Sequence, residues 1–323
     1  MAQMLMRSGY RLLLSLSTLF PLFSQPVLAQ EFPSKPIRIV TGSGPDLTAR
    51  IAGKKITEIL GQQIIAESIP AGSGKLAAEA VVKSKPDGYT LLNAVPSLII
   101  TGAVQGNLPD LSKDFAPVAI TNLLPFVLIV APELQVKTVE EFVRLVKSSP
   151  GKINFGSTNG TFPHLAIELF KSMTKTELFH VPYKNVPDTV TALLAGQIQV
   201  TVVPYGSVAG LHQSGKLNVL AVTSAERSRV LPNVPTLSES GLPGYGLSGW
   251  NGLLAPLGTP PEVIARLNGV IRQGGKDPEI IRQLAAIGNE PGPDFSPEQF
   301  AEFLRLEVTK WNKLVKEVGV KMN

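Results

Sequence analysis

Short apolar runs alternate with longer segments of helical periodicity along most of the chain. The run at residues 125–130 is continuous, which is typical of a strand buried on both faces. At residues 47–60, apolar side chains recur every three or four positions, which predicts an amphipathic helix. Because strand-like and helical segments alternate throughout, the pattern predicts the α/β class.

Capping signals mark several of the expected helix ends. Thr138 with Glu141, and Ser296 with Gln299, have the spacing of a capping box. Gly61 follows the periodic segment 47–60, and a glycine there is a common helix stop. We therefore expect helices to begin after Thr138 and Ser296, the last of them ending at residue 319.

One local arrangement occurs twice: a strand runs into a loop rich in Gly, Ser and Thr, and the loop opens a helix. The two loops are residues 41–46 and 156–163. Each would offer unpaired backbone N–H groups and the positive end of a helix dipole, which favour an anion. One such loop in each half of the chain suggests a small anion held between two lobes. The alternative is that both are ordinary strand–helix turns, which every α/β protein contains.

The N-terminal segment has the pattern of a secretory signal. Arg7 and Arg11 form a positive region, residues 12–23 form a short apolar core, and residues 27–29 suit a cleavage site. The apolar core is shorter than the roughly 20 residues that span a membrane. We expect cleavage near Ala29 and export to the periplasm.

The amino-acid composition excludes several kinds of functional site. The 323 residues include no cysteine and only three histidines, so thiol chemistry is excluded and a zinc site is not expected. The formal net charge of +5 comes without a basic run, so no nucleic-acid partner is expected. Residues 72–75 suggest a phosphate loop, but Ile69 and Leu76 stand where that motif needs Gly and Ser or Thr. No nucleophile–base pair can be assembled, so we expect no enzyme, no metal and no cofactor.

Eight segments carry a resemblance to a known family. They are residues 32–38, 86–92, 113–118, 180–184, 221–224, 234–236, 241–245 and 252–256. In order and spacing the chain resembles the Bug-type solute-binding proteins, the extracytoplasmic receptors of tripartite tricarboxylate transporters. The resemblance covers residues 32–320. It implies a two-lobed periplasmic-binding-protein architecture, type II-like, with two crossover strands and a central cleft.

The resemblance also implies how the chain is divided. Residues 1–29 would be the signal peptide, residues 30–126 and 250–323 lobe 1, and residues 127–249 lobe 2. The chain would cross between the lobes near residues 126–130 and return near residues 250–254.

The implied function is that of a periplasmic solute-binding protein. It would capture a small organic anion, a mono- or dicarboxylate, and deliver it as a monomer to the membrane subunits of a tripartite tricarboxylate-type transporter. One alternative is a sensing protein that presents a carboxylate to a signalling receptor. Another is a periplasmic enzyme on the same fold.

In this family the ligand is held mostly by backbone and hydroxyl donors, with ordered water, from one loop in each lobe. Carried over by position, the candidate ligand-binding residues are Gly42, Ser43, Gly44, Asp46, Ser97, Ser157, Thr158, Asn159, Gly160, Thr161, His164 and Tyr183. Three of them have alternatives. Asp46 could be a helix cap, Tyr183 could simply pack, and His164 could support its helix.

Three departures from the family pattern bear on the ligand. The loop at 42–46 is shorter than the usual proline- and double-glycine-rich stretch. Val203 and Pro204 replace an Asp-Asn pair, which removes a carboxylate that could hold an ammonium and disfavours an amino-acid ligand. Phe162 stands where small polar residues are common. It either favours a flatter or bulkier apolar ligand or packs beneath the loop.

Overall fold

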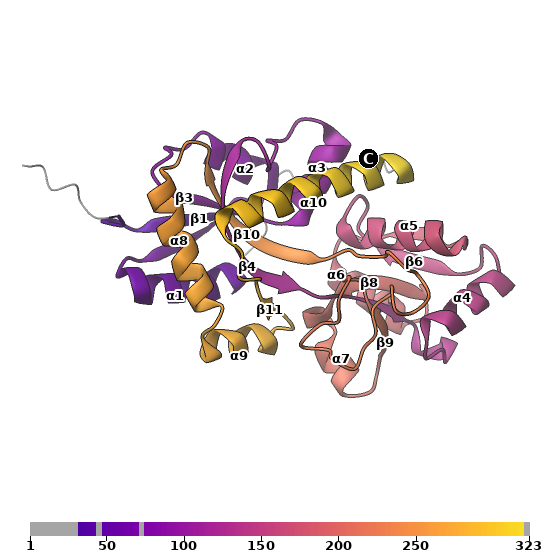
Figure 1. The fold of residues 1–323 in the computed structure, drawn as a ribbon. Helices are drawn as coiled ribbons and strands as arrows, with labels where there is room; N and C mark the ends of the chain where they lie inside the picture. The colour runs from indigo at the N-terminus through magenta and orange to yellow at the C-terminus, as the bar shows by residue number, and fades with distance from the viewer. Residues whose placement is uncertain (1–31, 43–46, 71–73, 320–323) are drawn as a thin grey trace, which may run out of the picture. The chain divides into compact units, whose positions relative to one another are not determined.

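The computed structural model describes residues 32–42, 47–70 and 74–319. The expected signal peptide with its cleavage position at Ala29, and the candidate residues Ser43, Gly44 and Asp46, lie outside these ranges. Within them the chain forms two β-sheets with associated helices (Figure 1), so the predicted α/β class is confirmed.

The first sheet has six strands in the order β11-β4-β10-β3-β1-β2. The strands are β1 (Ile37–Thr41), β2 (Ile64–Ser68), β3 (Thr90–Ala94), β4 (Phe115–Leu124), β10 (Gly249–Pro256) and β11 (Glu290–Pro291). The helices that belong with it in the chain are α1 (Leu47–Leu60), α2 (Lys75–Val82), α3 (Pro96–Gln105), α8 (Pro261–Gly274), α9 (Pro278–Ala286) and α10 (Pro297–Val318). Strands β1, β2 and β3 are parallel, and β10 runs antiparallel between β3 and β4.

The second sheet has five strands in the order β7-β6-β8-β5-β9. The strands are β5 (Phe126–Val130), β6 (Asn154–Ser157), β7 (Phe179–Pro182), β8 (Val200–Pro204) and β9 (Asn218–Val222). Its helices are α4 (Val139–Ser148), α5 (Phe162–Thr174), α6 (Val186–Leu194) and α7 (Ala209–Gln213), with short 3₁₀ turns η2 (Pro132–Leu134) and η3 (Tyr205–Ser207). Strands β6, β7 and β8 are parallel, and β5 runs antiparallel between β8 and β9.

The two sheets share one topology. In each, the first parallel strand (β1 or β6) lies between the second (β2 or β7) and the third (β3 or β8). An antiparallel strand, β10 or β5, follows the third. Parallel strands joined through helices place their carboxyl ends at the same edge, so each sheet has one edge where loops open helices.

The chain passes between the two sheets twice. Only Pro125 separates β4 of the first sheet from β5 of the second. The return lies in residues 223–248, between β9 and β10, and the expected residues 250–254 belong to β10 of the first sheet. Glu290 of β11 adds a link near these connections, because its carboxylate accepts hydrogen bonds from the Ser228 hydroxyl and, at 2.9 Å, from the Arg229 amide.

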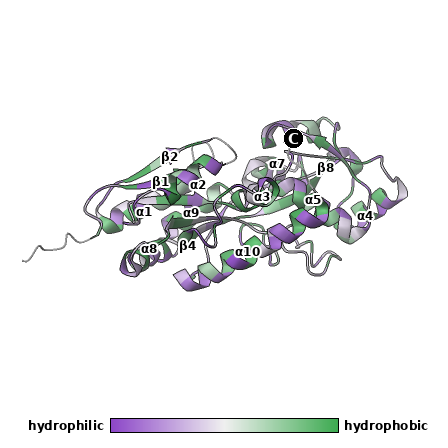
Figure 2. Cartoon of the chain, turned by 90° about the horizontal axis from the view of Figure 1, so that it is seen from above, coloured by the Kyte–Doolittle hydropathy of each residue, from purple (hydrophilic) through white to green (hydrophobic). Residues whose placement is uncertain are grey.

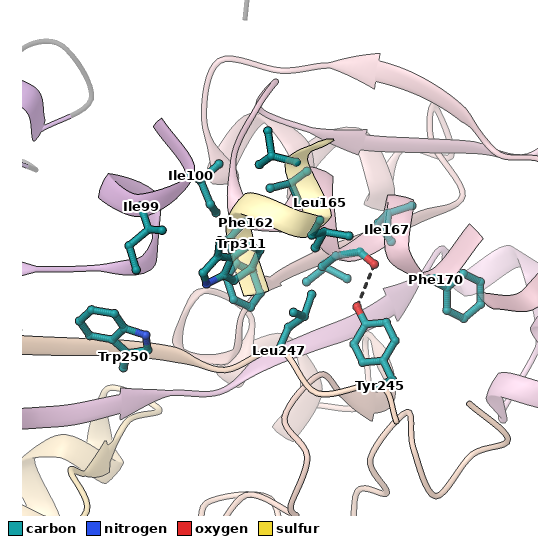
Figure 3. Packing of buried hydrophobic residues seen from close by; sticks show 14 of the residues in the cluster. Ile99, Ile100, Phe162, Leu165, Ile167, Phe170, Tyr245, Leu247, Trp250 and Trp311 are labelled. Carbon is teal, nitrogen blue, oxygen red and sulfur yellow. Dashed lines mark hydrogen bonds between the residues drawn. The ribbon is translucent and has the colours of Figure 1, made fainter. Parts of the chain in front are cut away.

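Helix α10 follows the strands of the first sheet but packs against α5 as well as α3. Its apolar and polar residues alternate along its length (Figure 2), as expected for a helix with one buried face. Trp311 lies 5.3 Å from Phe162 of α5, ring centroid to ring centroid, and the packing around this pair is shown in Figure 3. The same figure shows Tyr245 donating to the carbonyl of Ala166 in α5, at 2.8 Å.

A buried acid joins the two tryptophans of the chain. Trp250 of β10 and Trp311 of α10 both donate their indole N–H to Oε2 of Glu307, each at 3.0 Å. Glu307 is only 4% exposed, and Lys310 pairs with its other oxygen. A buried carboxylate is tolerated only when it is bonded in this way.

The predicted helix ends are confirmed. Thr138 and Glu141 exchange the two hydrogen bonds of a capping box at the start of α4. Ser296 and Gln299 do the same for α10. Gly61, directly after α1, has φ 68°, a left-handed conformation that favours glycine at a helix stop.

Candidate functional site

A pocket of about 200 Å³ lies at the carboxyl ends of the parallel strands β6 and β8. This is the edge of an α/β sheet where ligands generally bind. The described residues that line it are Ser97, Phe126, Ser157, Thr158, Thr161, Phe162, Pro163, Asn185, Val186, Thr189, Thr201, Val202, Val203 and Pro204. Ser97 comes from α3, so a helix that follows the first sheet contributes to a pocket built mostly from the second.

Three helices begin at this pocket. The first turns of α3, α5 and α6 supply Ser97, Phe162 and Val186 to its lining. Each helix N-terminus carries partial positive charge and backbone N–H groups without helical partners. The arrangement therefore directs three positive helix ends toward one space.

Side chains cap only one of these three helices. Asn185 caps α6 by accepting a hydrogen bond from the Asp188 amide at 2.9 Å. The residues at the cap positions of α3 and α5, Val95 and Thr161, make no side-chain cap hydrogen bond. Thr161 instead donates its hydroxyl to the carbonyl of Thr158 at 2.7 Å. The first amides of α3 and α5 are thus not taken by a cap side chain, which suits an incoming anion.

The loop between β6 and α5 is held by its own hydrogen bonds. Gly160 has φ 66°, in the left-handed region that glycine adopts without strain. Its amide donates to Nδ1 of His164 at 3.1 Å. With the bond from Thr161 to Thr158, this fixes the turn before a ligand arrives, which lowers the entropy cost of binding.

The described lining of the pocket combines hydroxyl and amide side chains with apolar ones and carries no charge. None of the described lining residues is acidic, basic or histidine. Val203 and Pro204 are part of the lining, so the carboxylate whose loss the sequence indicated is missing at the pocket itself. Any charge on a ligand would therefore meet hydroxyl groups, an amide side chain and helix ends.

The two nearby histidines add no charge beside the pocket at neutral pH. Burial is the main cause that lowers the pKa of His164 to about 4, and neighbouring His180 and Lys171 lower it further. Burial also lowers the pKa of His180. Both rings are therefore neutral at pH 7.

The structure brings together four of the candidate residues, Ser97, Ser157, Thr158 and Thr161, in the pocket lining. Asn159 and Gly160 belong to the same loop but are not among the lining residues. Gly42 does not line this pocket either. It abuts Gly74, since a Cβ on Gly42 would lie 2.3 Å from the Gly74 Cα.

Two further candidates lie behind the lining. His164 is 7% exposed and sits under the loop, bonded to Gly160. Tyr183 packs on Gly156, where its ring would be 3.1 Å from an added Cβ. Phe162 is 2% exposed and stacks on Phe126 at 4.0 Å, so it packs beneath the loop while also forming part of the wall.

Sequence reasoning missed the contribution of α6. Asn185 and Thr189 line the pocket, and Thr201 of β8 donates to the carbonyl of Gly156 at 2.7 Å. Asn185 stands three residues before Asp188 and two before Pro187, a helix-start signature that could have identified a third helix end after β7.

The residues that the structure describes bear on two other kinds of site. They hold no group of three or more His, Cys, Asp or Glu residues that could bind a metal ion. No helix among them is both long and apolar enough to cross a membrane.

Comparison with known proteins decides the family. Residues 48–320 match the family described as "Tripartite tricarboxylate transporter family receptor". The chain belongs to this family. As a receptor of tripartite tricarboxylate transporters it is an extracytoplasmic solute receptor, which confirms the resemblance and the expected class of function.

Individual relatives match over nearly their whole length. The chain is 30% identical to protein BugT of Bordetella pertussis over 305 residues, covering 92% of this chain and 93% of BugT. Rpa4515 of R. palustris, whose structure contains adipate, is 30% identical with a TM-score of 0.77, over 90% of this chain and 99% of that one. MatC of Rhodopseudomonas palustris, with bound malate, is 27% identical with a TM-score of 0.73, over 88% and 100% of the two chains. These neighbours have the two-lobed periplasmic-binding-protein fold that the sequence predicted.

Proposed function

We propose that this protein captures a small mono- or dicarboxylate in the periplasm and delivers it to the membrane subunits of a tripartite tricarboxylate-type transporter. The ligand is held in the pocket at the ends of β6 and β8. The observation that carries the proposal is a pocket at which three helices begin and whose described lining offers hydroxyl and amide groups among apolar side chains but no charged ones. The adipate in Rpa4515 and the malate in MatC support a carboxylate ligand.

Hydrogen bonds and helix ends attract a carboxylate without a basic side chain. A hydrogen bond to a charged group contributes about 1.5–3 kcal/mol, and a helix N-terminus adds about 0.3–1 kcal/mol. Two or three hydroxyl or amide donors with two uncapped helix ends sum to about 4–11 kcal/mol before the entropy of association is subtracted, without any arginine or lysine.

Delivery to a membrane partner requires a difference in conformation between the ligand-bound and the ligand-free receptor that the partner can recognise. We take residues 30–126 and 250–323 as lobe 1 and residues 127–249 as lobe 2, a division supported by the membership of the two sheets. A ligand that contacts both lobes favours the closed arrangement, because it binds that state more tightly. Ser43, Gly44 and Asp46 are the proposed lobe 1 contacts, with Asp46 donating through its backbone N–H, and Ser97 joins them.

Three further points belong to the same proposal. The receptor acts as a monomer and catalyses no reaction on its ligand. Its signal peptide, residues 1–29, is removed near Ala29. Mass spectrometry of the exported protein measures the mature N-terminus, and an intact N-terminus in the periplasmic fraction would refute cleavage.

Titration calorimetry with adipate, malate and a panel of other mono- and dicarboxylates tests the function. We expect at least one to bind and to raise the melting temperature. Ser97→Ala should weaken binding about 10-fold or more if its hydroxyl donates to the ligand. Ser148→Ala is the matched control, because Ser148 is exposed on α4 and bonds only within its helix. A panel without binding heat or thermal shift would refute the proposal.

A further inference from the structure

Two histidine rings are stacked beneath the loop 157–161. His164 comes from α5 and His180 from β7, and their ring centroids are 4.1 Å apart with 18° between the planes. Phe155 of β6 also stacks on His180, at 4.7 Å. Neither histidine lines the pocket, yet each one contacts an end of the loop that does.

His164 holds the Gly160 end of the loop. Its Nδ1 lies 3.1 Å from the Gly160 amide nitrogen. A backbone N–H can only donate, so Nδ1 is the acceptor and the neutral ring carries its proton on Nε2. That side of the ring faces Oε1 of Glu168 at 3.9 Å.

His180 contacts the Ser157 end of the loop. Its Nε2 lies 2.8 Å from the Ser157 hydroxyl and 3.2 Å from the Ser157 carbonyl oxygen. A carbonyl oxygen can only accept, so a proton on Nε2 is the arrangement that lets the imidazole donate to both Ser157 oxygens. The Ser157 hydroxyl then accepts from the imidazole, and its own hydrogen remains available for another acceptor.

Two charged groups lie next to the histidine pair. Glu168 and Lys171, both on α5, bond each other at 2.7 Å. Lys171 also lies 5.4 Å above the Phe155 ring. The histidines therefore lie beside an ion pair that is already matched, and the bond between His180 and Ser157 has no competing charged partner among these groups.

We propose that His180 is a positioning residue: its Nε2–H donates to Ser157 and thereby turns the Ser157 hydroxyl hydrogen toward the pocket, while His164 holds the Gly160 end of the same loop. This inference rests on the proposed function, because it assigns the direction of a donor toward a bound anion. A carboxylate only accepts hydrogen bonds. The placement of this one hydrogen therefore decides whether Ser157 attracts or repels the ligand.

The tautomers can be measured on the ligand-free protein by nitrogen-15 NMR of the histidine rings. We expect His180 to be protonated on Nε2 and His164 to be unprotonated on Nδ1. A neutral His180 protonated on Nδ1 alone would make Nε2 an acceptor for the Ser157 hydroxyl, and that result would overturn the proposal.

Binding of adipate and malate, measured by calorimetry, tests the consequence. His180→Ala should weaken binding about 10-fold or more, the range for one hydrogen bond to a charged group. His180→Gln keeps an N–H donor and should stay within about 3-fold of the wild-type affinity. The Gln variant also covers the case in which His180→Ala fails to fold, since a loss as large in Gln as in Ala would contradict a donor role.

A double-mutant cycle separates positioning from a general structural effect. Because His180 acts through the Ser157 hydroxyl, His180→Ala should cost less than about 2-fold once Ser157 is already Ala. Equal losses in both backgrounds would overturn the proposal. A wild-type protein that binds no member of the carboxylate panel would instead refute the proposed function, and the NMR measurement would still decide the tautomer of His180.

Discussion

Glu307 offers a strong test of how this fold is held together. Replacing it with Met keeps the length of the side chain and the helix propensity but removes the shared acceptor of Trp250 and Trp311. Each buried N–H left without a partner costs about 1–3 kcal/mol, so we expect a loss of roughly 2–6 kcal/mol in the free energy of unfolding. Lys310, partly exposed, adds at most about 1 kcal/mol through its lost ion pair.

Urea unfolding followed by circular dichroism measures this loss, and tryptophan emission reports the site itself, because both tryptophans of the chain donate to Glu307. Glu302→Met is the matched control. Glu302 is exposed on the same helix and pairs only with Arg305, so its loss should cost less than about 1 kcal/mol. If Glu307→Met costs no more than this control, the desolvation of the buried carboxylate offsets its two hydrogen bonds, and the reasoning is refuted.

Two more predictions concern the ligand loops. Gly42→Ala would bring a Cβ to 2.3 Å from the Gly74 Cα, so we expect about 1–3 kcal/mol of destabilisation, whereas Gly269→Ala, with open space around it on α8, should stabilise by about 0.5–1 kcal/mol. Thermal melts that rank the two alike would contradict this steric argument. The pKa of His164 is lowered to about 4 in the native protein. Between pH 6.5 and 4 the imidazole is therefore protonated in the unfolded chain but neutral in the native one. Stability should fall by up to about 3 kcal/mol from pH 6.5 to 4. His164→Asn, which keeps an acceptor for Gly160, should flatten that profile, and parallel urea-midpoint curves for the two proteins would argue against it.

The elements that the sequence predicts are those with local causes. The start of α4 depends on Thr138 and Glu141, which are three residues apart. The end of α1 depends on the conformation that Gly61 can adopt. The loop 156–163 was identified because its glycines and hydroxyl residues stand directly between a strand and a helix. It supplies three of the four predicted residues found in the pocket.

The parts that the sequence does not reveal depend on pairings between distant segments. His180 reaches Ser157 only because β7 lies parallel to β6 with Phe155 opposite His180. Trp311 meets Phe162 only because α10 packs on α5. The common topology of the two sheets is likewise a property of strand order, and the strands themselves, such as Ile37–Thr41 and Asn154–Ser157, share no sequence pattern that would show it.

The position of β10 has a consequence for how an exported chain of this kind acquires its structure. The second sheet is drawn entirely from residues 126–222, whereas the first needs β10 to join β3 to β4. As the polypeptide emerges from a translocation channel, the second sheet can therefore form completely before β10, a central strand of the first sheet, has emerged. We expect pulse-labelled hydrogen exchange to show amides of β5–β9 protected before those of β1–β4. Until β10 pairs with them, β3 and β4 would be the segments that a periplasmic chaperone needs to shield.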